Sequence, residues 1–304
     1  MSTGSNGSTG TGTPAASPGI WLLGMRPRTL TMAAVPVTVG AALAWAGGVR
    51  PDWVTFLVTL ACAVLIQIGT NLFNDARDGE RGADGPDRIG PVRITGSGLA
   101  EPRQVRRAAI ACFVAALIAG LYLIVVGGLP ILAIGIASLV AGYAYSSGPR
   151  PLSHGPFSEV YVIVFFGLIA VAGSHYLQSG VMPDAAVALT GIAVGSYAAA
   201  VLLVNNLRDT AADLRAGRKT LAGRLGPSWA KWLYGLLLLA PFPLLAAAWG
   251  WRALGIVWLA LPVCLWLAAR FARMPVGPAM NAQLGRTAMT QVLVGALLIG
   301  ELVT

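Results

Sequence analysis

Residues 54–78 read VTFLVTLACAVLIQIGTNLFNDARD, a long apolar run that ends in a cluster of amides and carboxylates. The apolar part has about the roughly 20 residues that an α-helix needs to cross a bilayer. Asn71, Asp75 and Asp78 follow one another at spacings of four and three, so a helix carries all three side chains on one face. The stretch therefore predicts a membrane-spanning helix with an oxygen-rich tip.

A second apolar run, residues 185–206, ends in the same manner. Asn205, Asp209 and Asp213 share one helix face because each follows the last by four positions. Further apolar runs lie between the two, and their number returns both polar ends to the same side of the membrane. We therefore expect two acidic helix tips that face each other.

The composition of the whole chain is that of a membrane protein. Of its 304 residues, 56% are hydrophobic and only 11% are charged, and the mean hydropathy is +0.71. An average soluble domain carries about 25% charged residues. Because a backbone in lipid must satisfy its own hydrogen bonds, the apolar runs of such a chain are helices. We expect an all-α, polytopic membrane protein.

Nine apolar segments are long enough to span, and they predict a bundle of nine transmembrane helices. They lie at about 29–47, 53–74, 105–126, 129–146, 159–178, 185–206, 229–249, 252–271 and 286–303. Residues 20–304 then form a single transmembrane domain. Residues 1–19 are mostly Ser, Gly, Thr, Pro and Ala without charge, a composition typical of a disordered tail.

The positions of the 21 Lys and Arg residues predict the orientation. With the N-terminus in the cytoplasm and the C-terminus outside, only Arg50 and Arg252 fall in outer segments, as the positive-inside rule requires. Both acidic tips are then cytoplasmic, on the inner or plasma membrane of the cell. The net charge of +9 does not indicate a nucleic-acid partner, because the basic residues sit at the ends of apolar spans.

The oxygen-rich tips suit Mg²⁺, which takes one or two carboxylates and completes its shell with water and substrate phosphates. The alternative is that these side chains are helix-end polar groups that meet water. Two clusters of mutually repelling carboxylates are more readily explained by a shared cation.

Basic loops accompany both tips. The first is followed by Arg77, Arg81, Arg88 and Arg93, and the second is surrounded by Arg208, Arg215, Arg218, Lys219 and Arg224. Carboxylates that hold a metal and cations that bind phosphate oxygens are the combination expected of a diphosphate site. Arg150, in a short basic turn on the same face, either meets a phosphate or anchors the chain at the inner leaflet.

A diphosphate site at the edge of an apolar bundle predicts a substrate with a charged head and a long apolar tail, such as a prenyl diphosphate. Departure of the diphosphate leaves an allylic cation, which aromatic rings shelter through their π faces. Tyr143 and Tyr145, at the end of the fourth span, are the candidates. The amides Asn74, Asn205 and Asn206 belong to the two tips and are expected to line the substrate site.

Several stretches resemble the UbiA superfamily of intramembrane prenyltransferases and, within it, the MenA branch, which prenylates 1,4-dihydroxy-2-naphthoate. They are WLLGMRPRTL, NLFNDARDGERGAD, GPVRITGSGL, YSSGPRPL, EVYVIVFFGLIAVAGSHYLQ and NNLRDTAADLRAGRKTLAGRLG. The resemblance covers about residues 21–304 and implies the bundle fold of that superfamily. It also implies a role for paired aspartate-rich motifs in binding Mg²⁺ and diphosphate.

Carried over residue by residue, the resemblance gives the metal and diphosphate site to Asn71, Asp75, Asp78, Asp209 and Asp213. It gives the cationic contacts to Arg88, Arg93, Arg208 and Lys219. Many 4-hydroxybenzoate enzymes have an aspartate four residues beyond the counterpart of Asp78, where this chain has Gly82. Asp84 follows two residues later, and whether it reaches the metal stays open.

The reaction implied is transfer of a polyprenyl group from polyprenyl diphosphate to 1,4-dihydroxy-2-naphthoate. CO₂ and diphosphate are lost, and demethylmenaquinone is formed. One alternative is a related transferase that acts on 4-hydroxybenzoate or another aromatic acceptor. Another is a transporter, but carriers place ionisable residues near mid-membrane on interrupted helices, whereas the charges here lie at span ends.

Overall fold

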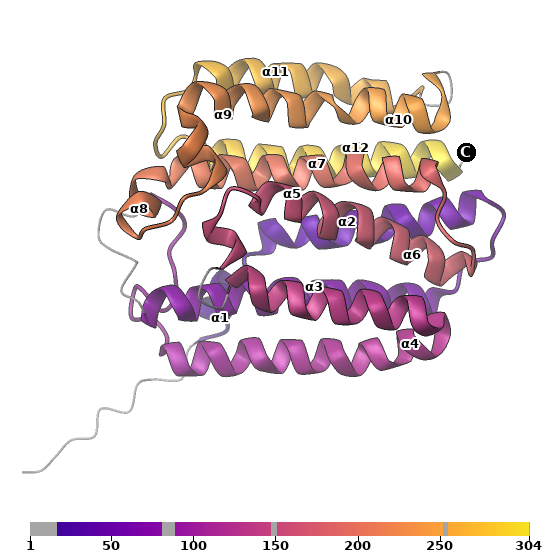
Figure 1. The fold of residues 1–304 in the computed structure, drawn as a ribbon, viewed down its shortest axis with the longest axis horizontal. Coiled ribbons are helices and arrows are strands. Elements are labelled where there is room, and N and C mark those ends of the chain that lie inside the picture. The colour runs from indigo at the N-terminus through magenta and orange to yellow at the C-terminus, as the bar shows by residue number, and fades with distance from the viewer. Residues whose placement is uncertain (1–16, 81–88, 147–150, 252–254, 304) are drawn as a thin grey trace, which may run out of the picture.

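The computed structural model describes residues 17–80, 89–146, 151–251 and 255–303 (Figure 1). Every regular element within these ranges is helical, so the all-α expectation is confirmed. The predicted tail, residues 1–19, falls largely outside the described part of the chain.

Seven helices of the described chain are long and apolar enough to cross a bilayer. They are α2 (Pro27–Ala46), α3 (Trp53–Glu80), α4 (Pro102–Ser146), the run of α5 (Ser158–Ile163), η2 (Val164–Ile169) and α6 (Ala170–Ser179), α7 (Ala185–Arg208), the pair α9 (Leu221–Leu239) and α10 (Pro241–Trp249), and α12 (Met280–Val303). The chain is therefore a multi-pass membrane protein.

The difference between nine expected spans and seven long helices has two sources. The expected spans at 105–126 and 129–146 are one continuous helical run, α4, but Gly128 has non-helical angles of φ 64° and ψ −150°. Pro130 follows, and Figure 1 shows α4 doubled back on itself as a hairpin. The second source is α11 (Leu261–Arg273), which has 13 residues and is too short to count as a long apolar helix.

The helices run along the long axis of the molecule, and α7 lies at the centre of the bundle (Figure 1). In its apolar window 78% of the residues are buried, against 17% in α4, which lies at the edge. Small residues let α7 approach its neighbour η2 closely. A Cβ atom on Gly167 of η2 would lie 2.4 Å from the carbonyl oxygen of Gly191 on α7. Only glycine fits this contact.

One end of the bundle is tied together by the amide of Gln178, at the end of α6. Its Oε1 accepts hydrogen bonds from Trp45 Nε1 at 2.9 Å and from the backbone N–H of Asp52 at 3.1 Å, and its Nε2 donates to the Asp52 carbonyl at 3.1 Å. This one side chain therefore joins the end of α2, the start of α3 and the end of α6.

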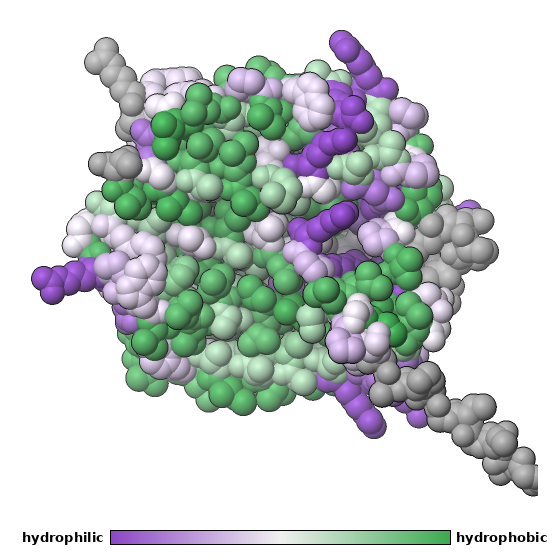
Figure 2. Space-filling model, turned by 180° about the vertical axis from the view of Figure 1, so that it is seen from behind, coloured by the Kyte–Doolittle hydropathy of each residue, from purple (hydrophilic) through white to green (hydrophobic). Residues whose placement is uncertain are grey.

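The opposite end carries most of the polar residues that concern function. Figure 2, seen from behind, shows hydrophilic residues gathered toward the right-hand half around a hollow, while apolar residues cover much of the left-hand half. The right-hand side of that view is the left-hand side of Figure 1, where α8 (Thr210–Arg215) follows α7.

Candidate functional site

The ends of α3 and of α7 with α8 lie at the same end of the bundle, although their acidic residues are far apart in the sequence (Figure 1). Arg218, just after α8, joins them. Its Nη2 lies 2.6 Å from Asp78 Oδ1 on α3, and its Nη1 lies 3.5 Å from Asp213 Oδ1 on α8. The two acidic tips therefore meet at one guanidinium group.

Asp78 is the residue of the first tip that faces the second. Its side chain is buried, and its carboxylate forms ion pairs with both Arg93 and Arg218. Two guanidinium groups on one buried carboxylate place an excess of positive charge beside it, which is the charge that phosphate oxygens require.

Asp213, on the second tip, lies in a crowded electrostatic environment. Burial raises the pKa of Asp213 to about 6; Arg218 opposes this shift, and the nearby carboxylates of Asp209 and Asp78 add to it. Carboxylates that raise the pKa of Asp213 in this way also attract a divalent cation. Carboxylates are hard oxygen donors of the kind that Mg²⁺ takes, but in the described residues no group of three or more His, Cys, Asp or Glu side chains could hold an ion by itself.

Asp209 is held by its own neighbour. Arg208 donates from Nε to Asp209 Oδ1 at 2.8 Å and from Nη2 to Oδ2 at 2.6 Å, a bidentate pair. The Arg208 guanidinium also donates to the side-chain oxygens of Asn205 and Asn281, each at 2.8 Å. Arg208 is predicted to bind substrate. In the structure its N–H groups donate to other side chains of the protein, and these hydrogen bonds hold Asp209 and Asn205 in place.

The side chains of Asn205 and Asn206, both predicted to line the substrate site, point in different directions. Asn205 lines a cavity that extends into the bundle and is described below. The Asn206 amide is buried, and it donates to Glu159 Oε1 at 2.9 Å, beside Ser158. Consecutive helical residues point about 100° apart, so only one of the two asparagines reaches the site. Asn206, which the sequence analysis expected to line the substrate site, therefore contacts Glu159 and does not line this cavity.

On the first tip, Asn71 is tied to the joint between α1 (Pro18–Met25) and α2. Its Nδ2 donates to the Met25 carbonyl at 3.0 Å and to Thr29 Oγ1 at 2.9 Å, and its Oδ1 accepts from Gln67 Nε2 at 3.3 Å. Asn71 is thereby fixed by the protein with its side chain at the cavity wall.

Asp75 and Asn74 differ in the direction they face. Asn74 lines the cavity, and its carbonyl accepts from Arg93 Nη1 at 3.0 Å. The Asp75 carboxylate, which is 1% exposed, accepts hydrogen bonds from Ile94 and Thr95 instead.

Three predicted site residues, Asp84, Arg88 and Arg150, lie outside the described residues. Lys219 is exposed, and its backbone N–H donates to the carbonyl of His154 at 2.8 Å. Its neighbour Arg218 is the residue that reaches both tips, because the chain turns at Gly217, which has a φ of 73°. Both residues accompany the second tip in the sequence, but the family resemblance gave the cationic contact with the substrate to Lys219 and not to Arg218.

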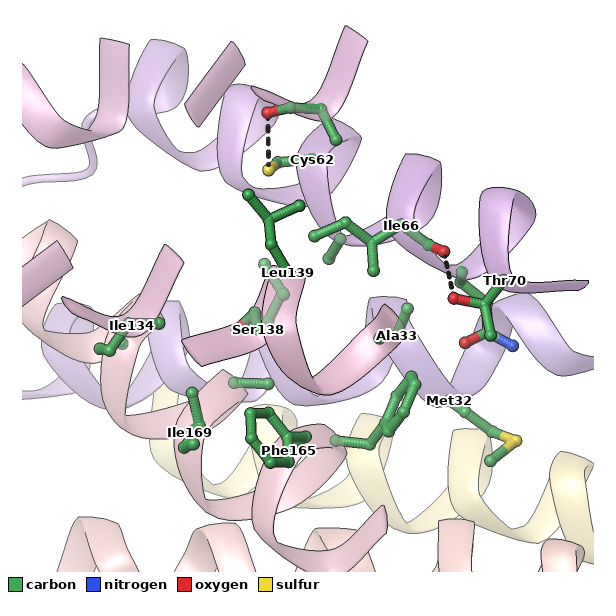
Figure 3. A pocket seen from close by; sticks show the side chains of 18 of the residues that line it. Met32, Ala33, Cys62, Ile66, Thr70, Ile134, Ser138, Leu139, Phe165 and Ile169 are labelled. Carbon is green, nitrogen blue, oxygen red and sulfur yellow. Dashed lines mark hydrogen bonds between the residues drawn. The ribbon is translucent and has the colours of Figure 1, made fainter. Parts of the chain in front are cut away.

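A cavity of about 360 Å³ begins at the tips and extends into the bundle. Its polar end is lined by Arg26, Thr29, Gln67, Asn71, Asn74 and Asn205. Figure 3 shows the apolar part between α3 on one side and Phe165 and Ile169 on the other, with Ile134 and Leu139 of α4 closing it. Along α3 the lining reaches from Asn74 back to Thr59, about 22 Å at the helical rise.

Aromatic rings follow the polar end of this cavity. The ring centroids of Tyr145 and Tyr161 are 5.2 Å apart, and those of Tyr161 and Phe165 are 4.5 Å apart; all three residues line the cavity. Tyr143 is 66% exposed and lies on an outer apolar groove with Phe113. Residues two apart on a helix face nearly opposite ways, so Tyr143, expected beside the cation, does not line the same cavity as Tyr145.

Arg26 lines the cavity, although it is not among the residues that the sequence analysis selects. It lies between α1 and α2 with a φ of 53°, the one non-glycine residue of the described chain with positive φ, and it lines the polar end of the cavity. The signal that pointed to it is Pro27, which starts α2 and forces a break at the preceding residue.

Comparison with known proteins identifies the family of this chain. The model of the UbiA prenyltransferase family matches residues 33–288. The 1,4-dihydroxy-2-naphthoate octaprenyltransferase of Mycobacterium tuberculosis is 38% identical over 271 residues, which cover 88% of each chain. The enzyme of that name from Escherichia coli is 36% identical, over 92% of this chain and 93% of its own.

The fold also matches a solved structure. A UbiA homolog from Archaeoglobus fulgidus bound to DMAPP and Mg²⁺ superposes with a TM-score of 0.66 at 17% identity, over 93% of this chain and 99% of that one. With the family model covering most of the chain and relatives above 30% identity along nearly its full length, this chain belongs to the UbiA prenyltransferase family.

Proposed function

We propose that this protein transfers a polyprenyl group from polyprenyl diphosphate to 1,4-dihydroxy-2-naphthoate, releasing CO₂ and diphosphate and forming demethylmenaquinone in its reduced, quinol form. The observation that carries the proposal is the meeting of Asp78 and Asp213 at Arg218, on the same helix ends whose residues Asn74 and Asn205 line the polar end of an apolar cavity. A charged head and a long tail each find their own environment there. The relatives named for octaprenyl transfer to this naphthoate support the choice of acceptor.

We further propose nine membrane crossings, with α4 counted as two about Gly128 and α11 counted as one. The N-terminus is then cytoplasmic, the C-terminus lies outside, and the site opens on the cytoplasmic face of the cell membrane. The distribution of Lys and Arg supports this orientation.

The acidic residues would hold Mg²⁺ through Asp78, Asp209 and Asp213, with Asn71 and Asn205 at the cavity wall beside them. A metal held there would supply positive charge to neutralise the leaving diphosphate. Arg93 and Arg218 bind the remaining phosphate oxygens, because their guanidinium groups already lie on either side of Asp78. As the C–O bond breaks, its electron pair stays with the diphosphate.

The allylic cation that remains lies against the row formed by Tyr145, Tyr161 and Phe165, whose π faces stabilise positive charge and exclude water. The acceptor ring forms a C–C bond at its carboxylate-bearing carbon. Loss of CO₂ then returns the electron pair of the broken bond to the ring, which restores aromaticity and gives demethylmenaquinone in its reduced form.

The proposal is tested with purified protein in nanodiscs, a polyprenyl diphosphate and Mg²⁺, offered 1,4-dihydroxy-2-naphthoate or 4-hydroxybenzoate. We expect product from the naphthoate only, with a mass that has lost one CO₂. Product from 4-hydroxybenzoate alone would show the alternative acceptor to be correct. Product that forms equally well after thorough removal of Mg²⁺ would contradict the metal site.

The raised pKa of Asp213 predicts that Mg²⁺ binding depends on pH. A carboxyl group with a pKa of about 6 is mostly ionised at pH 7 and mostly protonated at pH 5, and only the ionised form binds the cation. Mg²⁺ affinity should fall about tenfold between pH 7 and pH 5. Mg²⁺-dependent thermal stabilisation of the purified protein measures it, and Asp213→Asn should remove the pH dependence.

The wall of the cavity predicts which residue limits the prenyl tail. Gly135 on α4 lines the cavity, and a Cβ atom there would meet nothing within 4 Å. Gly135→Phe should therefore fold normally but fill the channel, lowering kcat/KM for long donors about tenfold while sparing short ones. The control is Val140→Phe, on an exposed position of the same helix. Equal loss for all donor lengths would contradict this assignment of the tail.

A further inference from the structure

The segment from Arg93 to Ala100 folds back on itself beside the last turns of α3. The Ser97 Oγ donates to the Arg93 carbonyl at 2.6 Å, and the Ala100 N–H donates to the Ile94 carbonyl at 2.9 Å. The Ile94 side chain is fully buried in a small apolar cluster with Leu72. We call residues 93–100 the arginine loop, since Arg93 stands at its start.

Asp75 fastens this loop to the helix. Its Oδ1 accepts from the Thr95 N–H at 3.0 Å and from Thr95 Oγ1 at 2.6 Å, and its Oδ2 accepts from the Ile94 N–H at 3.2 Å. The Thr95 hydroxyl also lies 2.7 Å from the Asp75 carbonyl oxygen. Both carboxylate oxygens therefore face the loop, and the side chain is almost completely buried.

The fastening decides where Arg93 lies. The two residues whose N–H groups bind Asp75 come directly after it, so the position of its Cα follows from theirs. From there its guanidinium donates to the Asn74 carbonyl and pairs with Asp78. The loop thus brings a cation to the first acidic tip from a position nearly twenty residues later in the chain.

We infer that Asp75 is a positioning residue, which holds the arginine loop so that Arg93 meets Asp78 and the diphosphate, and that it does not bind Mg²⁺. The inference rests on the proposed function for the nature of the substrate. Its basis is that Asp75 and Asp78, three positions apart on one helix, have their carboxylates on different partners: one on backbone N–H groups and a hydroxyl, the other on two guanidinium groups.

Asp75→Asn tests the inference, because the amide keeps the size of the side chain but turns an N–H donor toward one of the loop donors. We expect the KM for the prenyl diphosphate to rise about tenfold. Mg²⁺ affinity, measured without substrate by thermal stabilisation, should stay at the wild-type value. Asp78→Asn, the matched change on the same helix, should weaken Mg²⁺ binding instead. Loss of Mg²⁺ affinity in Asp75→Asn to the extent seen in Asp78→Asn would overturn the inference.

Thr95→Val tests the same contact with every carboxylate left in place, and it serves if Asp75→Asn does not fold. It removes the hydroxyl that binds Asp75 and keeps the shape of the side chain. We expect faster hydrogen exchange of the loop amides and a several-fold rise in the KM for diphosphate, with Mg²⁺ affinity unchanged. An unchanged KM in this variant would count against the inference.

A double mutant shows whether the effect passes through Arg93. If Asp75 acts by placing Arg93, then adding Asp75→Asn to Arg93→Ala should raise the KM little beyond the single change. Fully additive effects would overturn the inference. Failure of the proposed function is distinguishable, since the wild-type protein would then make no prenylated product, while Mg²⁺ affinity and hydrogen exchange still test Asp75.

Discussion

Replacing Asp78 with Asn should lower turnover about 10³-fold while the protein still folds and inserts. The carboxylate lies between Arg93 and Arg218, at the point where the two acidic tips meet. In the proposed mechanism it holds the cation and the two arginines that stabilise the negative charge developing on the diphosphate, and losing one such group typically costs two to three orders of magnitude in kcat. The assay is formation of prenylated naphthoate at saturating substrate and Mg²⁺.

The matched control is Glu80→Gln, on the same helix end two residues later. Glu80 pairs with Arg106 at 2.7 Å, and both side chains are partly exposed to solvent. An ion pair of this kind contributes little to stability. Glu80→Gln should therefore keep wild-type turnover, and a comparable loss in both variants would point to a general electrostatic effect rather than a role for Asp78 itself.

Arg218→Ala should have the second-largest effect, a loss of about 10² in kcat/KM. This guanidinium bridges carboxylates from two helices and is positioned to bind a phosphate oxygen once they hold a metal. Its removal leaves Asp78 and Asp213 facing each other without it, so the apparent pKa of Asp213 should rise further. Both the kinetic constants and the pH dependence of Mg²⁺ binding measure this.

Arg218→Lys separates charge from shape. A lysine keeps the positive charge but lacks the planar fork that contacts two carboxylates at once. Activity in this variant should recover only in part. Arg224→Ala is the control, because Arg224 is exposed and its Nε lies 3.4 Å from a backbone carbonyl of Lys219, away from the acidic tips. Wild-type kinetics in the Arg218→Ala protein would show that the contact of Arg218 with Asp78 and Asp213 has no role in the reaction.

The sequence was sufficient to predict the helical membrane fold and the meeting of the two acidic tips. Both rest on strong signals: runs of apolar residues, and oxygen-bearing side chains at helical spacing. The hairpin within α4 was also predictable in outline, as two expected spans, because Gly128 and Pro130 interrupt the apolar run.

The sequence alone did not show in which direction individual side chains of the site helices point. Asn206 is next to Asn205, yet it contacts Glu159 rather than the cavity, and Tyr143 points outward two residues before Tyr145 points inward. Once the direction of one residue is known, helix periodicity is enough to predict that a residue one or two positions away points elsewhere. The role of Arg208 was not predictable, because its partner Asn281 comes from a distant helix.

At the end of the bundle away from the acidic tips, the cavity is lined by the buried side chains of Leu123, Ile131 and Leu177. Nearby, the amide of Gln178 fastens three helix ends together. In the described part of the chain, apolar side chains therefore line the cavity at the end remote from the acidic tips. Such a lining solvates a hydrocarbon tail but neither water nor ions, so the cavity favours a lipid-like substrate over small polar solutes.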